Sequence, residues 1–245
     1  MVTGSPDLIR QYGVEALWYL CPLAQVESIL RLGILCHNRA HAEGLVVERI
    51  DDPNVQDRRG LAMCGKKQFH LHDCANLFFA KHTPMLWHAV NVQRKGPTTA
   101  HVQVDPGILT EDGVFFSDGN CAADETDIYD NLHMLERLNW EAIRARSFRN
   151  GDWPAVPDPY TGEPRANPTY KRCKSAEVLV PKRVSPEWFV AANLVFAGLA
   201  MILLRDIMRS PWLPYVPIAV VVMLFYSMDN ASLTLLFMTA SAGPD

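Results

Sequence analysis

One glutamate beside an apolar run is the first residue of this sequence with the potential for chemistry. Glu177 lies in the segment SAEVLVP, directly after the cations Lys171, Arg172 and Lys174. A glutamate at the edge of a strand commonly forms a surface ion pair with a lysine, and such pairs contribute little. The alternative is a carboxylate at the mouth of a cleft, next to a basic strip that can contact phosphates. The residues alone leave both interpretations open.

A pair of arginines is the second candidate. Arg58 and Arg59 lie in VQDRRG, within a polar stretch over residues 38–68. A polar stretch of this length predicts a long loop, and long loops in compact domains are usually functional or disordered. The arginines are either solvated charges or a guanidinium fork that binds a pyrophosphate or a nucleic-acid backbone.

Histidines and cysteines do not assemble a metal site in the sequence. His70, His72 and Asp73 form an HxHD cluster whose histidines would point the same way on a strand. No further ligands complete the set that zinc needs, so we expect no metal cofactor. The 6 cysteines are far apart and include no CxxC pair, which excludes a zinc ribbon and a thioredoxin-type motif.

Composition limits the class of protein. The chain has 245 residues, of which 49% are apolar and 20% charged, enough for one large domain or two small ones. Its net charge of −4 excludes a protein that coats DNA nonspecifically, so nucleic acid would have to bind a local basic patch. The first residues show no basic region followed by an apolar stretch, so we expect no signal peptide and a cytoplasmic location.

Apolar spacing and Pro/Gly punctuation predict the elements that must position these residues. We expect a strand over 16–20, a helix over 22–32 ending at Gly33, and strands within 69–90, 101–110 and 113–120. Further along, the pattern predicts a helix over 126–146 capped by Thr126, and an extended loop over 150–169.

The C-terminal quarter permits a membrane interpretation. Residues 188–204 and 210–228 carry no charge, and each run approaches the length of about 18 residues that spans a bilayer. The charged RDIMR between them and the prolines at the start of the second run disfavour a membrane hairpin. We therefore favour a strand over 189–196, a helix over 198–209 and a buried strand over 218–226. A membrane partner is not expected, but the residues alone do not exclude one.

Taken in order, several segments resemble the DarT family. WYLCPLAQVESILRLGILCHN is similar to the family's first strand and helix, and VQDRRG resembles its ERR segment. LHDCANLFFAKHTPMLW resembles HDYVPFYF-x-x-RSPMLY, and GVFFSDGNCAA resembles a TDGNAA-like turn. LNWEAI is similar to a family helix, and YKRCKSAEVLV to a KRxxxAExLV strand. Each motif is modest alone, but together and in the same order they are specific.

The resemblance implies a fold and a domain organisation. The fold class would be α+β, an ADP-ribosyltransferase fold related to the poly-ADP-ribose polymerases, with a mixed central β-sheet, flanking helices and NAD bound in a cleft. We expect an N-terminal extension over residues 1–15, the ADP-ribosyltransferase domain over 16–226 and an apolar C-terminal tail over 227–245.

The resemblance also implies roles for individual residues. Glu177 matches the family's catalytic glutamate, and Arg59 matches its catalytic arginine, which also contacts NAD. The other implied NAD-binding positions are Tyr19, Leu20, Cys21, Ser28 and Phe78. The candidate nucleic-acid contacts are Lys171, Arg172, Lys174 and His82. The sequence departs from the family where Tyr19 replaces a histidine, Phe78 a tyrosine and His82 an arginine.

The implied reaction is transfer of ADP-ribose from NAD to a base in single-stranded DNA, thymidine in the family pattern, with release of nicotinamide. A carboxylate stabilises the positive charge that develops on the ribose, and a positioned base must remove the proton of a thymine imide. A base in single-stranded DNA is reachable without melting a duplex. The family pairs such toxins with a macrodomain antitoxin, so a DarG-like protein is the implied partner. RNA or protein as the acceptor, and a non-catalytic or membrane-attached interaction protein, are the alternatives.

Overall fold

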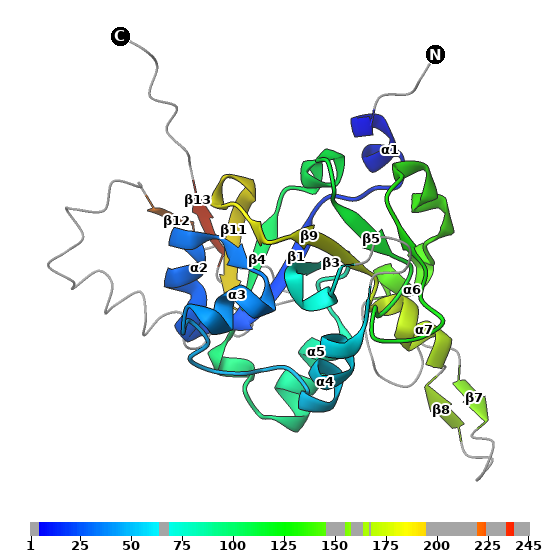
Figure 1. Cartoon of the computed structure of the whole chain (residues 1–245), viewed down its shortest axis with the longest axis horizontal. Helices are drawn as coiled ribbons and strands as arrows, with labels where there is room; N and C mark the ends of the chain where they lie inside the picture. Colours follow the sequence, from blue (N-terminus) through cyan, green and yellow to red (C-terminus); the bar gives the residue numbers. More distant parts are fainter. Residues whose placement is uncertain are drawn as a thin grey trace, which may run out of the picture.

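A computed structural model of the chain describes residues 5–63, 69–145, 155–157, 164–166, 168–194, 220–223 and 234–237. Within these residues a nine-stranded sheet forms the centre of the molecule (Figure 1). In spatial order its strands are β12 (Val220–Met223), β13 (Thr234–Phe237), β11 (Phe189–Leu194), β4 (Thr99–Val104), β1 (Leu17–Pro22), β3 (Cys74–Phe78), β9 (Glu177–Pro181), β5 (Phe115–Ser117) and β6 (Ile128–Tyr129).

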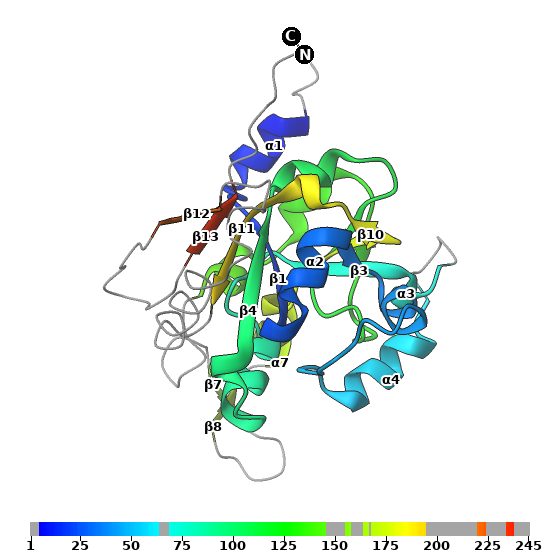
Figure 2. The same cartoon turned by 90° about the vertical axis from the view of Figure 1, so that its left-hand side faces the viewer.

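The helices are short and surround this sheet. They are α1 (Ser5–Gln11), α2 (Val26–Leu32), α3 (His37–Ala42), α4 (Pro53–Leu61), α5 (Pro84–Trp87), α6 (Trp140–Arg144) and α7 (Pro168–Lys174). Two small sheets pair β10 (Arg183–Val184) with β2 (Ile34–Leu35), and β7 (Ala155–Pro157) with β8 (Pro164–Ala166). Figure 2 shows α2, α3 and α4 together on one side of the molecule, with α1 at the opposite end. The predicted α+β class is confirmed, although every described strand pair is antiparallel rather than mixed.

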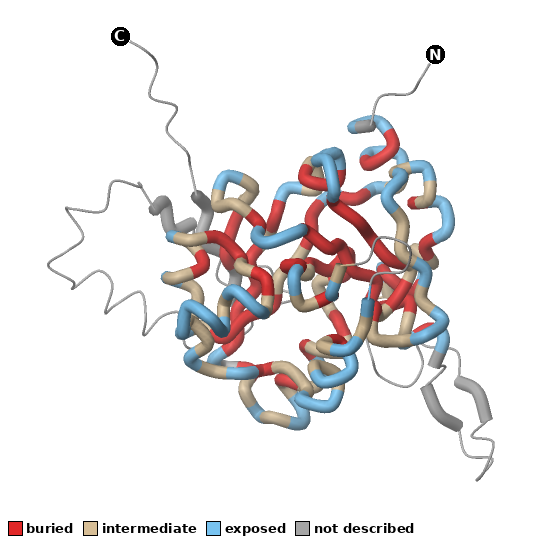
Figure 3. The backbone as a smooth tube through the Cα atoms, viewed as in Figure 1, coloured by how far each residue is buried: buried red, intermediate tan, exposed pale blue. Residues whose placement is uncertain are grey.

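The core lies along the middle strands, where the burial colouring of Figure 3 is most continuous. Leu17, Leu77, Val102 and Val178 come from β1, β3, β4 and β9 and are fully buried in one cluster. Because alternate residues of a strand point to opposite faces, strands buried on both faces read as unbroken apolar runs. This explains why β1, β3 and β9 were recognisable in the sequence.

The opening unit follows the predicted strand, helix and glycine stop. A short 3₁₀ turn over Leu23–Gln25 precedes α2, so the predicted helix over 22–32 is two consecutive pieces. Gly33 ends α2 with a φ of 90° and a ψ of 175°, and its amide donates to Ile29 at 2.8 Å. A Cβ at Gly33 would lie 2.3 Å from the carbonyl oxygen of Val184, so glycine is required there.

The predicted loop over 38–68 is wrong over much of its length, because it contains α3 and α4. Asp52 begins α4 as its N-cap by accepting a hydrogen bond from the Asn54 amide, and Pro53 occupies the first turn. Arg59 is the buried residue of α4. Because the buried residue of α4 is an arginine, the helix has no apolar stripe from which it could be predicted in the sequence. Residues 64–68 lie outside the described residues.

Other predicted elements are also shorter than expected. In 69–90 only β3 is a regular strand, because Thr83 caps α5 by accepting from the Leu86 amide and a π-helical turn follows over His88–Val92. Within 101–110 the strand ends at Val104, and a 3₁₀ helix follows over Pro106–Thr110.

The single helix predicted over 126–146 is wrong. It is divided into β6, a 3₁₀ helix over Leu132–Arg137, and α6. Asn131 and Asn139 each accept a hydrogen bond from a backbone amide and so begin new elements inside the run. Thr126 is not a helix cap, since its hydroxyl donates to the Asn120 carbonyl at 2.7 Å.

At the C-terminal end, β11 confirms most of the strand predicted over 189–196, and β12 lies within the strand predicted over 218–226. The predicted helix over 198–209 lies outside the described residues, as does most of the predicted loop over 150–169, in which β7 and β8 pair. β13, inside the segment 227–245, pairs with both β11 and β12. No helix among the described residues is both long and apolar enough to cross a membrane.

Candidate active site

Glu177 begins β9, between β3 and β5 in the interior of the sheet. Ser117 fixes this position because its hydroxyl accepts from the Glu177 amide at 3.0 Å and donates to the Gly119 carbonyl at 2.6 Å. In the register of β3 with β9, Phe78 lies opposite Glu177. Strand pairing therefore places Glu177 beside Phe78, the implied NAD-binding residue that replaces a tyrosine of the family.

The Glu177 carboxylate is held by Arg59. Nη1 of Arg59 lies 2.9 Å from Oε1 and 2.8 Å from Oε2, and the Cys121 amide donates to Oε1 at 3.1 Å. Glu177 is 2% exposed and Arg59 5% exposed. The interpretation of Glu177 as a surface glutamate paired with a lysine is therefore wrong, because the ion pair is buried and its cation is Arg59.

The two arginines of VQDRRG have different environments. Arg58 is exposed, and its Nε donates to the Asn54 carbonyl at 3.4 Å. Arg59 points inward from α4 to β9. Burial, the largest single cause, acts to lower the pKa of Arg59, but the electrostatic effects of Glu177 and Cys121 and the hydrogen bond to Glu177 together outweigh it, and the net shift of the pKa is upward. Arg59 is therefore cationic in the site.

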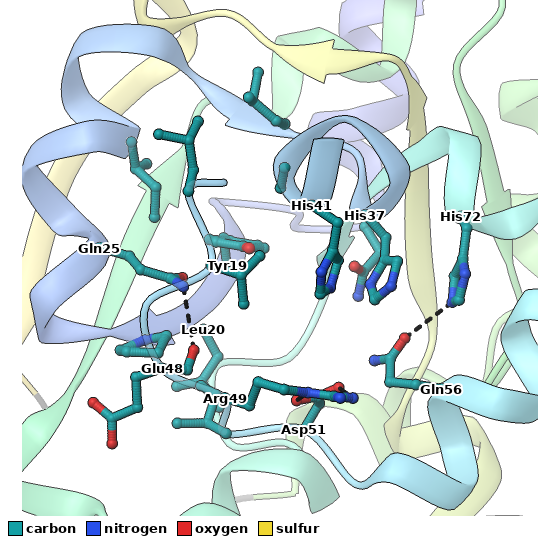
Figure 4. A pocket seen from close by; sticks show the side chains of 18 of the residues that line it. Tyr19, Leu20, Gln25, His37, His41, Glu48, Arg49, Asp51, Gln56 and His72 are labelled. Atoms are coloured by element: carbon teal, nitrogen blue, oxygen red, sulfur yellow. Dashed lines mark hydrogen bonds and ion pairs between the residues drawn. The ribbon is translucent and has the colours of Figure 1, made fainter. Parts of the chain in front are cut away.

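A pocket adjoins this ion pair on the side of α2 and α3; we call it the first pocket (Figure 4). Of the predicted NAD-binding residues, Tyr19, Leu20, Ser28 and Arg59 line it. Burial raises the pKa of Tyr19, with smaller contributions from Cys21 and Asp51, so its hydroxyl stays protonated. The Ser28 hydroxyl donates to the Gln25 carbonyl at 2.8 Å.

Cys21 differs from its neighbours on β1. Its side chain is fully buried in the core, and its thiol donates to the Ala100 carbonyl at 3.7 Å. Burial raises the pKa of this thiol to about 12. Unlike Tyr19 and Leu20, Cys21 does not line the first pocket.

Three histidines lie on the wall of the first pocket, and two of them, His37 and His41, were missed by the sequence analysis, which named only His72 as part of the HxHD cluster. The ring of His37 stacks on His72 with centroids 3.9 Å apart, and lies 4.3 Å from the ring of His41 (Figure 4). Burial, then the charges of His72 and His41, lower the pKa of His37 to about 4, so it is neutral at neutral pH. The spacing of His37 and His41 by four positions is helical and would have linked them had α3 been predicted.

A second pocket lies on the other side of the ion pair. Glu177 and Phe78 line it, together with Trp87 of α5 and Lys171 of α7. It shares with the first pocket the residues Asp51, Gln56, Arg59, Asn76 and Met85. The two pockets therefore meet at Arg59, and Glu177 is among the residues that line the second.

The structure places the predicted nucleic-acid residues in different environments. Lys171 is exposed at the second pocket. Arg172 also lines it, but its guanidinium pairs with Asp118 at 2.8 Å. Lys174 is 2% exposed, donates to the Ile143 carbonyl at 2.7 Å, and does not fit a phosphate contact. Burial lowers the pKa of Lys174 to about 8.

His82 lies outside both pockets, half-buried, and its pKa is lowered by burial and then by Lys81. The HxHD cluster is not a strand: His70 precedes a 3₁₀ turn over Leu71–Asp73, and Nε2 of His72 lies 3.1 Å from Oε1 of Gln56. Among the described residues no group of histidine, cysteine and acidic side chains is placed to hold a metal.

A family model described as "ssDNA thymidine ADP-ribosyltransferase, DarT" matches residues 18–193 of the chain. The chain belongs to the DarT family. A curated DNA ADP-ribosyl transferase–DNA ADP-ribosyl glycohydrolase fusion protein from Thermosipho africanus is 27% identical over 175 residues, or 71% of this chain. The match covers 41% of that relative, so this DarT chain spans less than half of its length.

Solved DarT structures share the fold. Thermosipho africanus DarTG in complex with ADP-ribose matches with a TM-score of 0.63 and 25% identity, over 80% of this chain and 48% of that chain. Thermus sp. 2.9 DarT in complex with ADP-ribosylated ssDNA matches with a TM-score of 0.63 and 21% identity, over 81% and 90% of the respective chains. Thermus sp. 2.9 DarT in complex with NAD+ gives a TM-score of 0.56 at 19% identity, over 81% and 91%. The predicted ADP-ribosyltransferase fold is thereby confirmed.

Proposed function

We propose that this DarT protein transfers ADP-ribose from NAD to a thymidine base in single-stranded DNA and releases nicotinamide. The observation that carries the proposal is the buried Arg59–Glu177 pair at the junction of two pockets. A transferase of this kind must bring a donor and an acceptor to one reacting carbon, and the junction provides a place where both can meet. The description of the matching family supplies the substrate class.

NAD is the proposed ligand of the first pocket, with its nicotinamide ribose directed toward Arg59. Breaking the bond between the ribose and nicotinamide produces an oxocarbenium-like sugar, which a carboxylate held in a fixed orientation stabilises. Glu177 is that carboxylate, and Arg59 together with the Cys121 amide orients it. The nicotinamide extends past Arg59 into the second pocket, where Phe78, opposite Glu177 on β3, supplies the ring against which it stacks.

The acceptor base enters from the second pocket. A new bond forms between the ribose carbon and the thymine ring nitrogen, and the proton of that nitrogen passes to a base. Glu177 is the proposed proton acceptor, because it lines the second pocket and is held by Arg59 at the pocket junction, whereas Asp51, another carboxylate there, is paired with Arg49. Arg59 stays protonated beside it and acts as a positioning residue.

The biological setting is part of the same proposal. The Thermosipho africanus relative joins a DNA ADP-ribosyl transferase to a DNA ADP-ribosyl glycohydrolase in one chain. We infer that this DarT protein is the toxin of a toxin–antitoxin pair in the cytoplasm, with a DarG-like macrodomain protein that removes the modification as its partner.

Mass spectrometry of thymine-containing oligonucleotides incubated with the protein and NAD tests the proposal. We expect a mass increase of one ADP-ribose unit per modified strand, and free nicotinamide in equal amount. Glu177→Gln should abolish the increase in protein that circular dichroism shows to be folded. Its melting temperature should fall, because Arg59 keeps a hydrogen bond to the amide oxygen but loses the opposite charge. The exposed Glu187→Gln is the matched control and should retain activity.

The other acceptors give distinguishable outcomes. An adduct on RNA or on protein, with none on DNA, would refute DNA as the substrate while leaving NAD chemistry in place. Absence of nicotinamide release with any acceptor would refute the enzyme and favour a binding protein.

A further inference from the structure

One aromatic side chain at the second pocket is exposed to solvent. Trp87 ends α5 and is 46% exposed, and it is the aromatic residue among the large exposed apolar side chains of the described part of the chain. No described aromatic ring stacks on its indole. Exposing a tryptophan in this way leaves apolar area in water, which a stacked ligand would cover.

Exposed cations lie on two other helices that line the same pocket. Arg58 comes from α4 and Lys171 from α7, and neither is paired with a carboxylate within the described residues. Asp51 pairs with Arg49 at 2.7 Å, and Asp52 accepts from the Asn54 amide at 2.9 Å. Among the described residues, Asp52 is thus the carboxylate of the pocket lining that has no cationic partner, and the two unpaired cations outnumber it. The net charge at the pocket mouth is therefore positive.

An aromatic face and unpaired cations around one pocket match the chemistry of a single nucleic-acid strand. Bases stack on tryptophan regardless of their identity, while phosphates follow a positively charged groove. The base that reacts must reach the buried Arg59–Glu177 pair. An indole that is half-exposed lies instead at the mouth of the pocket, where a neighbouring base of the same strand passes.

We propose that Trp87 is a stacking platform for a base that flanks the modified base, and that Arg58 and Lys171 bind the phosphates on that stretch of single-stranded DNA. This inference rests on the proposed function and adds the residues that hold the acceptor strand. Trp87 is a positioning residue, because it contacts the strand away from the reacting atoms.

Oligonucleotide binding to full-length Glu177→Gln protein tests the proposal without requiring catalysis. In fluorescence anisotropy with a labelled single-stranded DNA, adding Trp87→Ala should weaken binding by about 5- to 150-fold, since one stacked base contributes about 1–3 kcal/mol. Trp87→Phe should retain most of the affinity. Val92→Ala, at another exposed apolar residue outside the pocket, is the matched control and should bind as tightly as the parent.

The cations have a separate readout. Arg58→Ala and Lys171→Ala should each weaken binding and reduce the slope of log affinity against log salt by about 0.7. NAD affinity should be unchanged in all of these variants. Trp87→Ala binding as tightly as the parent, or Trp87→Phe binding as weakly as Trp87→Ala, would overturn the stacking role.

Failure of this proposal and failure of the proposed function are distinguishable. Binding of DNA that depends on Trp87, with no ADP-ribose adduct from the wild-type protein, would refute the transfer reaction and leave the strand site. If Trp87→Ala protein formed the adduct with an unchanged KM for the oligonucleotide, the strand site would be refuted and the transfer reaction would stand. If an RNA strand of the same sequence bound in a way that depended on Trp87 while the DNA strand did not bind, the assignment to DNA would also be overturned.

Discussion

Nη1 of Arg59 contacts both carboxylate oxygens of Glu177, although the two residues are 118 positions apart in the chain. The contact joins α4 to the start of β9 inside the protein. Taking two charges out of water is costly, and their attraction offsets that cost only while both are present. The pair is therefore a structural tie as well as the proposed catalytic centre.

Replacing one partner of this pair should destabilise the fold. Arg59→Ala leaves the Glu177 carboxylate buried without its cation, and we expect a loss of about 3–5 kcal/mol in the free energy of unfolding. Arg58→Ala, at the exposed neighbour, should change it by less than about 0.5 kcal/mol. Urea denaturation of both variants measures this. Equal stability of the two would show that the Arg59–Glu177 contact contributes nothing to folding.

The neighbouring lysines of α7 should separate stability from DNA binding. The Lys174 ammonium donates to the carbonyls of Ile143 and Ala145. Lys174→Met leaves these carbonyls without a donor and should cost about 1–3 kcal/mol of stability, with oligonucleotide affinity unchanged. Lys171→Met should instead weaken oligonucleotide binding and leave the stability unchanged. Weaker DNA binding by a Lys174→Met protein of unaltered melting temperature would restore Lys174 as a phosphate contact.

Part of the site could be predicted because strands and motifs are local. The apolar runs of β1 and β9 are visible in the sequence, and the segments around Arg59 and Glu177 resemble the family's motifs. The contact between those two residues is not local, since it depends on the order of strands in the sheet. Before the structure was described, only the resemblance to the family implied that these two residues belong to one site.

The rest could not be predicted, for a physical reason seen in α4. Its buried residue is Arg59, so the helix shows no apolar periodicity, and the stabilising partner is the distant Glu177. Asp52 and Pro53 are helix start signals that were present in the sequence. Because α3 was also predicted as loop, the neighbouring imidazoles of His37 and His41 had no helix to place them on one face.

A buried histidine should make stability fall in acid. His101 is 3% exposed, and burial, followed by the charges of Lys81 and His82, lowers its pKa from 6.5 to about 3. Below pH 6.5, the pKa of histidine in the unfolded chain, the unfolded chain binds a proton. In the folded protein His101 stays unprotonated until the pH falls to its pKa of about 3. The free energy of unfolding therefore declines as the pH falls from 6.5 to about 3.

Replacing this histidine removes its contribution. His101→Phe keeps a ring beside Trp18 and should show a smaller loss of melting temperature between pH 6.5 and pH 4 than the wild-type protein. His133→Phe, at an exposed position, should follow the wild-type curve. Parallel pH profiles for the wild-type and His101→Phe proteins would show that His101 titrates alike in both states.

Gly33 should be the glycine of the first pocket that tolerates no side chain. Its φ of 90° and ψ of 175° lie in a region that is essentially restricted to glycine. An added Cβ would also meet the Val184 carbonyl oxygen at 2.3 Å, where β10 pairs with β2. Gly33→Ala should therefore cost more than about 2 kcal/mol of stability and weaken NAD binding at the adjoining pocket.

Gly44 offers a matched comparison with the same sign of φ. Its φ is 65°, but an added Cβ would find nothing within 4 Å. Gly44→Ala should cost only the backbone strain of about 1–2 kcal/mol and leave NAD affinity unchanged. Thermal unfolding and NAD titration of the two variants measure both effects. If Gly33→Ala were no more harmful than Gly44→Ala, the close approach of α2's end to β10 would not constrain the pocket wall.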